Sequence, residues 1–461
     1  MTNVAELSRQ LSAREISARE ALAASMARIA TTDARVNAFT DHSFDRALAE
    51  ADAVDAKRTK NEALSPLAGV PYAVKNLFNI EGVVTRAGSK VNRSHAPASA
   101  DAVLVQHMQA AGSVLVGALN MDEYAYGFTT ENSHDGPCHN PHDLTRVAGG
   151  SSGGSGAAVA AGQVGIALGS DTNGSIRVPA SLCGVWGLKP TFGRLSRGGS
   201  YPFVHSIDHL GPLADCVEGL VWSYDAMQGA DPLDPGCHAL SVQPVANEMQ
   251  RSVDGLRIGV LNGYFHDNAT PPAREIVALA ANVLGAQNEV EWPDAAPGRA
   301  AAFIISASEG GSLHLEDLRT RADDFEPLSV DRFISGALQP AAWYLRAQRF
   351  RRVYRDKINA LFRDWDILLA PATPVSAPVI GTEFFDINGT SVPCRPSVGL
   401  LTQPISFMGC PVVAAPMWPN GTGGLPIGVQ IIAAPWREDL ALRAAWVLQQ
   451  SGVAHTKEAA L

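Results

Sequence analysis

The sequence feature that most constrains the fold is a stretch rich in Gly and Ser, residues 149–191 (GGSSGGSGAAVAAGQVGIALGSDTNGSIRVPASLCGVWGLKPT). It contains the apolar runs AAVAAG and VGIAL, which a flexible linker would lack. Glycine at this density lets one backbone segment approach another, or a bound molecule, closely. The stretch therefore predicts a packed site whose working groups are serine hydroxyls and backbone N–H groups.

Local patterns in this stretch place two serines on turns that flank one helix and one strand. We predict a tight turn at residues 149–152, a short helix packed through Ala at 152–162 and a buried strand at 164–168. A second turn is predicted at residues 169–175, followed by a helix or turn. Ser151 and Ser175 are therefore expected to meet in space.

The same stretch closely resembles the amidase signature family. The matching segments are GGSSGGS (149–155), GSDT (169–172), GSIR (174–177), CG (183–184) and GLKPT (187–191), with PYAVKN (71–76) upstream. The resemblance covers nearly the whole chain. It implies an α/β fold in which a large mixed β-sheet is flanked by helices on both faces, as an α/β/α sandwich.

The resemblance implies hydrolysis of an amide bond with a Ser-cisSer-Lys triad and with no metal or other cofactor. Ser175 is then the nucleophile, Ser151 relays the proton and Lys75 is the base. A lysine is ordinarily charged at neutral pH, but burial at the end of a strand lowers its pKa. A serine hydroxyl suits the relay because it donates and accepts at once. The family has a cis peptide bond here, which corresponds to Gly150–Ser151.

By the same resemblance, the backbone N–H groups of Thr172, Asn173, Gly174 and Ser175 form the oxyanion site. The family usually has two glycines before the nucleophile, and Asn173 replaces the first of them. Asparagine tolerates a left-handed backbone better than most residues. We therefore expect the loop to persist, with a pocket reshaped by this side chain.

Two charged residues flank the nucleophile, and a third group supports the base. Asp171 and Arg177 are expected to form an ion pair that braces the loop, with direct substrate binding as the alternative role of Arg177. Ser152 is expected to support Lys75 or the relay. Asp122 and Glu123 are adjacent carboxylates, but neighbouring side chains point apart, so turn capping and packing are favoured over catalysis.

The substrate side of the site is predicted from a loop and a helix. In the family, the loop at residues 126–132 lines the substrate pocket, which assigns Tyr126 and Thr129 as substrate contacts. A small anionic amide needs a cation, and the planar fork of arginine binds a carboxylate with two hydrogen bonds. Alignment with amidotransferase A subunits places their carboxylate-binding arginine at Arg351, on a long helix predicted over residues 341–365, with Arg177 as the runner-up.

Composition bounds the remaining choices. With 461 residues, 46% of them apolar, the chain is predicted as a single domain, 1–461: a helical layer (1–60), a catalytic core (65–215) and the rest of the sheet and pocket (250–450). A net charge of -10 without a dense basic run argues against nucleic acid and membrane as partners. Six scattered cysteines and a polar, charged N-terminus favour a cytoplasmic protein.

Three other functions stay open at this point. One is the A subunit of a tRNA-dependent amidotransferase, which uses the same triad to release ammonia from glutamine. Another is a catalytically silent binding subunit. The third is an α/β-hydrolase with Ser152 as nucleophile, because GSSGG (150–154) fits the GxSxG pattern, although a polar loop precedes it where that pattern needs a strand.

The resemblance also implies a partner. Relatives of the amidotransferase type work with a small helical companion subunit, similar to the amidotransferase C subunit, that wraps the enzyme. We therefore expect a heterotetramer of two large and two small subunits.

Overall fold

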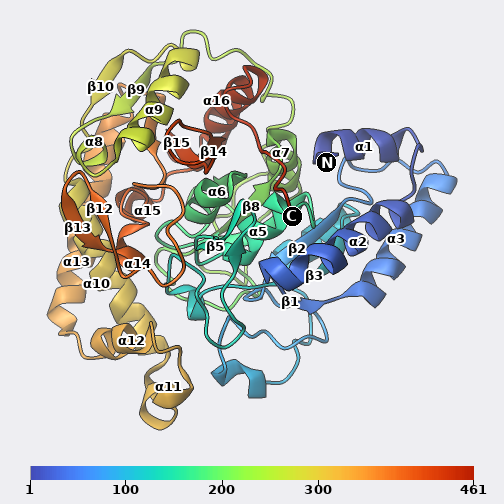
Figure 1. Cartoon of the computed structure of the whole chain (residues 1–461), viewed down its shortest axis with the longest axis horizontal. Coiled ribbons are helices and arrows are strands. Elements are labelled where there is room, and N and C mark those ends of the chain that lie inside the picture. Colours follow the sequence, from blue (N-terminus) through green and yellow to red (C-terminus); the bar gives the residue numbers. More distant parts are fainter. Residues whose placement is uncertain (1) are drawn as a thin grey trace.

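A computed structural model describes residues 2–461 and contains a large mixed sheet that runs through the molecule (Figure 1). Within the described residues, this sheet has 11 strands. Their spatial order is β1 (Phe39–His42), β3 (Val114–Leu119), β2 (Pro71–Lys75), β6 (Ile166–Asp171), β8 (His209–Ala214), β7 (Trp186–Lys189), β14 (Val412–Met417), β15 (Ile427–Ala433), β11 (Ile367–Pro371), β9 (Ile258–Leu261) and β10 (Asn288–Val290). Strands from both halves of the chain therefore build one sheet.

The strand directions decide where the site lies. β2 pairs in parallel with both β3 and β6, while β8 runs antiparallel to β6. The carboxyl ends of β2 and β6 therefore lie at the same edge of the sheet. Two short ribbons lie outside it: β4 (His139–Asn140) with β5 (Asp143–Val147), and β12 (Phe384–Ile387) with β13 (Thr390–Pro393).

Helices cover both faces of the sheet, and further helices lie beside it (Figure 1). They are α1 (Val4–Ser12), α2 (Ala18–Val36), α3 (Phe44–Thr59), α4 (Val103–Ala110), α5 (Gly153–Ala160), α6 (Arg177–Cys183), α7 (Val217–Met227), α8 (Tyr264–Asp267), α9 (Pro271–Leu284), α10 (Ala295–Leu313), α11 (Leu315–Thr320), α12 (Val330–Ala337), α13 (Ala341–Leu361), α14 (Cys394–Ser397), α15 (Gln403–Met408) and α16 (Glu438–Gln450). Short 3₁₀ turns lie at Val91–Ser94, Glu123–Ala125 and Ala322–Asp324. No helix of residues 2–461 combines the length and apolar character that a membrane crossing requires.

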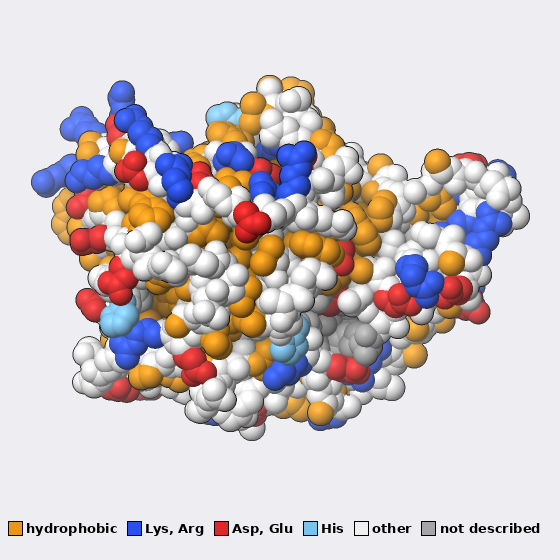
Figure 2. Space-filling model, turned by 90° about the horizontal axis from the view of Figure 1, so that it is seen from above, with side chains coloured by type: hydrophobic (Ala, Val, Ile, Leu, Met, Phe, Trp, Pro, Cys, Tyr) orange, Lys and Arg blue, Asp and Glu red, His pale blue; other side chains and the backbone are white. Residues whose placement is uncertain are grey.

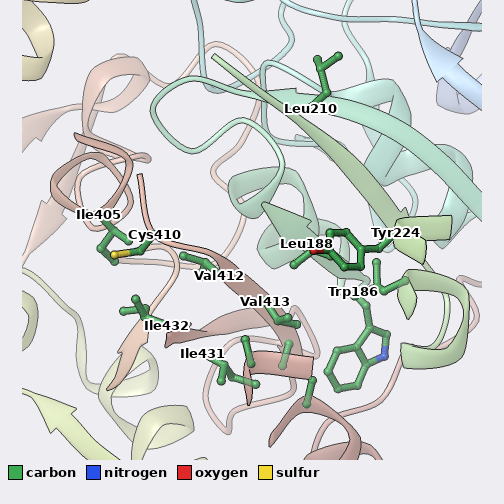
Figure 3. Packing of buried hydrophobic residues seen from close by; sticks show 14 of the residues in the cluster. Trp186, Leu188, Leu210, Tyr224, Ile405, Cys410, Val412, Val413, Ile431 and Ile432 are labelled. Carbon is green, nitrogen blue, oxygen red and sulfur yellow. The ribbon is translucent and has the colours of Figure 1, made fainter. Parts of the chain in front are cut away.

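At β2, two hydrophobic cores lie on opposite faces of the sheet. Along β2, Tyr72 and Val74 join the core that contains α4 and α7, while Ala73 joins the core of α2, α3 and α5. This alternation follows from the two-residue period of a strand. Figure 3 shows the packing further along, where Leu188 of β7 lies near Val413 of β14 and Ile431 of β15. The predicted layered α/β fold is confirmed.

One local prediction needs correction. The N-terminal layer expected to be helical also contains β1, an edge strand paired antiparallel with β3 after α2 ends at a left-handed Asn37 (φ 56°). The segment before β14 forms α15, with proline in its first turn and Gly409 (φ 91°) at its end. The strand follows only at Val412. α2 begins with a capping box formed by Ser17 and Glu20.

Helices α10 to α13, orange in Figure 1, form a group at one side of the molecule. α10 packs against α12, α13 and α15. Figure 2 shows Lys and Arg side chains gathered at one edge of the face seen from above, on the side where α13 lies in Figure 1. Four of the arginines on α13 are exposed (Arg346, Arg349, Arg352, Arg355), and Arg351 is buried.

Candidate active site

Lys75 ends β2 with its ammonium group fully buried among serine hydroxyls. Its Nζ donates to Ser151 Oγ at 2.6 Å, to Ser170 Oγ at 2.9 Å and to Ser152 Oγ at 3.0 Å. Ser170 lies near the end of β6, and the two other serines lie in the turn before α5. The parallel pairing of β2 and β6 thus brings the amine and these hydroxyls to one edge of the sheet.

Burial sets the charge state of this lysine. Removal from water disfavours the ammonium form, and it lowers the pKa of Lys75 to about 7. The negative charges of Asp122, Asp208 and Asp171 oppose this shift without cancelling it. Close to neutral pH, the amine can therefore exist in its neutral form and accept a proton, as a general base must.

The turn that carries Ser151 is held by close backbone packing. The Gly150–Ser151 peptide bond is cis, as expected. A side chain on Gly150 would collide with Asp122 Oδ2, so glycine is needed for this close approach. Asp122 also donates its backbone N–H to Ser151 O at 3.2 Å and accepts from Thr130 N at 3.0 Å. Its role here is to fix the turn, which agrees with the packing role predicted for it.

Ser175 lies between β6 and α6 and faces a small cavity of about 20 Å³. It is 2% exposed, and no hydrogen bond joins its Oγ to Ser151 Oγ in residues 2–461. The structure thus assembles Lys75 and Ser151 directly and places Ser175 at the neighbouring cavity. Tyr126, Asn173 and Arg332 also line this cavity.

The loop before Ser175 presents free backbone N–H groups. Within residues 2–461, no acceptor is bonded to the N–H of Asn173, Gly174 or Ser175. Gly174 has φ 143°, and a side chain on it would collide with Thr402 Oγ1. The positive φ falls on Gly174 and not on Asn173. The loop therefore does not use the left-handed tolerance of asparagine that the sequence suggested.

Asp171 and Arg177 form the expected ion pair beneath this loop. Arg177 Nε lies 2.9 Å from Asp171 Oδ2, and both side chains are fully buried. Burial would raise the pKa of Asp171, but Arg177 outweighs it and holds that pKa below its usual range. Arg177 also donates to Gln430 Oε1 at 2.7 Å and Ser406 Oγ at 2.5 Å. Its donors are thus used within the protein, which favours bracing over substrate binding.

The three predicted substrate contacts, Tyr126, Thr129 and Arg351, differ in their position relative to the cavity at Ser175. Tyr126 lines the cavity at Ser175, but Thr129 is buried and lines none of the cavities near the site. Arg351 donates to the backbone oxygens of Phe407 at 3.0 Å and Ser206 at 2.7 Å and does not reach the cavity.

The arginine beside Ser175 is Arg332, on α12, which sequence reasoning did not single out. Its guanidinium lies over the Tyr126 ring, 3.7 Å from the centroid, and it donates to Tyr126 O at 3.1 Å. No local motif marks it, because α12 reaches the site only through the packing of α10 and α12.

A second cavity of about 310 Å³ adjoins the first and shares Ala125, Thr172 and Phe203 with it. It is lined by Ser170, which accepts from Lys75, and by Asp208, which accepts from Thr172 Oγ1 at 2.6 Å.

Among residues 2–461, His, Cys, Asp and Glu side chains do not gather in groups of three or more that could hold a metal ion.

Two relatives match nearly the whole length of this chain. The chain is 70% identical over 441 residues to the AtzE subunit of 1-carboxybiuret hydrolase from Pseudomonas sp. strain ADP, covering 96% of each chain. It is 38% identical to the A subunit of glutamyl-tRNA(Gln) amidotransferase from Moorella thermoacetica, covering 98% of this chain and 97% of the relative. These two relatives are named for different activities.

A solved structure is similar along the whole chain. It is described as a vestigial protein complex that reveals the evolutionary origins of an s-triazine catabolic enzyme, and it superposes with a TM-score of 0.98. Its sequence is 68% identical, and the match covers 99% of this chain and 100% of the other. The family model for amidases matches residues 20–442. With these matches over nearly its whole length, the chain belongs to the amidase family.

Proposed function

We propose that this protein hydrolyses a small amide with Ser175 as nucleophile, Ser151 as proton relay and Lys75 as base. The observation that carries the proposal is the bond from a buried, weakly basic lysine to the hydroxyl of the cis serine. A buried carboxylate partner would keep the lysine charged, whereas hydroxyls leave it able to take up a proton. Ser152 and Ser170 hold the amine in place.

The reaction then proceeds in two halves. Lys75 takes the proton of Ser151, which takes the proton of Ser175, and Ser175 Oγ attacks the amide carbon. The N–H groups of Thr172, Asn173, Gly174 and Ser175 form the site that stabilises the oxyanion, and removing one such donor typically lowers the rate about 10²- to 10³-fold. Lys75 then returns a proton through Ser151 to the amide nitrogen of the substrate, and this nitrogen leaves as ammonia. Water then attacks the acyl-enzyme by the same relay and frees Ser175.

The proposed substrate is 1-carboxybiuret, converted with water to urea-1,3-dicarboxylate and ammonia. The relative that is 70% identical is named for this substrate, whereas the glutaminase-type relative is 38% identical. The substrate carries a carboxylate, and Arg332 is the cationic residue that, among residues 2–461, lines the cavity that contains Ser175. Arg332 is therefore the favoured anion-binding residue, while the role first predicted for Arg351 would require its guanidinium to leave two backbone carbonyls.

The test is an ammonia-release assay over 1-carboxybiuret, biuret, glutamine and a simple aliphatic amide. Ammonia from 1-carboxybiuret at the highest kcat/KM supports the proposal, and preferred turnover of glutamine would instead support the amidotransferase alternative. Absence of ammonia from all four, together with tight binding of any one, would favour a silent binding subunit.

A matched pair of variants tests the anion site. Arg332→Gln should lower kcat/KM for 1-carboxybiuret about 30- to 1000-fold, because it removes a charge-assisted pair of about 2–4 kcal/mol. Arg351→Gln, on the control position, should change it far less. Both variants should have an equally small effect on kcat/KM for an uncharged amide. The reverse ranking would return the role to Arg351.

We further infer that the enzyme works in the cytoplasm as a heterotetramer with a small helical companion subunit. The similar solved structure is described as a protein complex, and the similar relative is named as a subunit. All six cysteines are free, which suits a reducing compartment. Light scattering of the chain with and without its companion tests the assembly, and a fully active monomer would contradict it.

A further inference from the structure

The side chain of Asn173 is clamped in the wall of the cavity that contains Ser175. It is 8% exposed and lies in the loop between β6 and α6. Its Nδ2 donates to Ser306 Oγ of α10 at 2.8 Å. Its backbone oxygen accepts from Thr402 Oγ1 at 2.7 Å. Both ends of the residue are therefore fixed by segments that lie far away in the sequence.

One atom of this side chain is left without a partner. Asn173 Oδ1 is buried and receives no hydrogen bond from any donor within residues 2–461. A buried acceptor without a donor costs about 1–3 kcal/mol. Ser306 Oγ accepts from Nδ2 and so defines the orientation in which Oδ1 has no donor. In this orientation the residue offers an acceptor in the wall of the cavity that contains Ser175.

We propose that Asn173 Oδ1 accepts a hydrogen bond from an N–H group bonded to the scissile carbonyl on its acyl side, and so selects ureides over carboxamides. The proposal rests on the proposed function of the Ser175 site. Asn173 lies two residues before Ser175, and its own backbone N–H belongs to the predicted oxyanion site. Its side chain is therefore placed to contact atoms that adjoin the reacting carbonyl.

The chemistry of the two substrate classes supplies the discrimination. In a ureide, the acyl-side neighbour of the scissile carbon is an N–H, which can donate. In a carboxamide such as glutamine, the neighbour is a CH₂ group, which leaves the buried oxygen unpaired. A site built to hydrogen-bond an N–H rejects analogues that lack it, because its own polar atom then stays unsatisfied.

The experiment compares biuret with malonamide, which differ only in a central N–H against CH₂. Each is measured as a competitor of 1-carboxybiuret hydrolysis, which gives an apparent affinity whether or not the competitor is turned over. The protein with Asn173 should prefer biuret by about 10- to 100-fold, the value of one well-placed buried hydrogen bond. Asn173→Leu and Asn173→Gly should abolish the preference by weakening biuret alone.

Two further variants separate the alternatives. Asn173→Asp keeps an acceptor and should keep the preference, whereas a contact made through Nδ2 would lose it and overturn the proposal. Ser306→Ala frees the amide and should reduce the preference in part. Equal weakening of both competitors by Asn173→Leu would show a contact with the shared leaving group or a structural role, and would also overturn it. Melting temperatures of all variants confirm that they are folded.

The outcome for the proposed function is distinguishable. If 1-carboxybiuret releases no ammonia, that function fails. The biuret and malonamide comparison, run against whichever amide does react, still decides the role of Asn173.

Discussion

Lys75 and Lys189 end two strands of the same sheet, and both are fully buried. Burial lowers the pKa of each to about 7, and the neighbouring charge of Arg177 adds to the effect at Lys189. Their partners differ in kind. Lys75 donates to three serine hydroxyls, whereas Lys189 donates to the backbone oxygens of Cys410 and of Pro190, the latter at 3.0 Å.

This difference shows why burial and a lowered pKa do not by themselves mark a base. A carbonyl only accepts, so it holds an amine that donates and offers it no proton in return. A hydroxyl can reverse its role and deliver a proton to the amine as it accepts one elsewhere. Lys75 is therefore bonded to hydroxyl groups that can exchange protons with it, whereas Lys189 is bonded to two backbone carbonyls that cannot.

The largest expected effect separates the two lysines by activity. Lys75→Met should lower kcat by about 10⁴- to 10⁶-fold, as loss of a member of a catalytic unit does. Lys189→Met should lower it by about tenfold or less, because no proton passes through it. Rates of ammonia release, with circular dichroism to verify folding, decide the matter. An equal loss in a folded Lys189→Met protein would contradict the distinction by partner type.

The hydroxyls around Lys75 can be separated in the same way. Ser151→Ala should lower kcat by about 10²- to 10⁴-fold, because it removes the proton relay. Ser170→Ala removes one neutral hydrogen bond of about 0.5–1.5 kcal/mol and should lower kcat about 2- to 12-fold. The two variants have equal volume changes, so the ratio of their rates is the readout. Equal losses would mean that both serines only position the amine.

A stability measurement should reverse the ranking of the two lysines. Lys189→Met leaves the carbonyls of Cys410 and Pro190 buried without a donor, which should lower the free energy of unfolding by about 2–4 kcal/mol. Lys75→Met leaves hydroxyls, which can bond to nearby groups, as Ser152 already does with Ser170 O at 3.1 Å. Lys75→Met should therefore lower the free energy of unfolding by less than Lys189→Met does. Urea titrations of both variants test this, and a more stable Lys189→Met protein would argue against a structural role.

The sequence was sufficient for the parts of the site that lie in one continuous stretch or at a strand end. The cis bond at Gly150–Ser151 and the presence of Lys75 at the site are what the resemblance to the amidase signature family implies, and the Asp171–Arg177 pair joins residues of one short motif. The layered fold is predicted by the family resemblance. Strands such as β3, β11 and β14 are apolar runs, whereas the edge strands β1 and β10 contain polar residues.

What the sequence could not provide were contacts made across the fold. Arg332 enters the cavity from α12, and its helix has no motif that points to Ser175. The partner of Asn173 is Ser306 on α10, and only packing brings the two together. Alignment with amidotransferase A subunits favours Arg351 as the carboxylate-binding residue, yet its buried guanidinium donates to backbone oxygens.

The smallest expected effect concerns the pH dependence that distinguishes a base from a structural lysine. If neutral Lys75 accepts the proton, kcat/KM should rise about tenfold per pH unit below pH 7 and level off above it, because burial places the pKa of Lys75 at about 7. Asp122 raises that pKa through its negative charge. Asp122→Asn keeps an oxygen for the Thr130 N–H but removes the charge, so the midpoint should move to lower pH.

The matched control is Asp364→Asn, at an exposed aspartate beyond the end of α13, which should leave the midpoint unchanged. The readout is the midpoint of the profile and not its plateau, since Asp122 also holds the turn at Ser151 and its loss can lower the maximal rate. Lys189→Met should not move the midpoint either, although the pKa of Lys189 is also lowered to about 7. A midpoint that moves with Lys189→Met and not with Asp122→Asn would identify Lys189, and not Lys75, as the titrating group. That result would contradict the distinction between the two lysines.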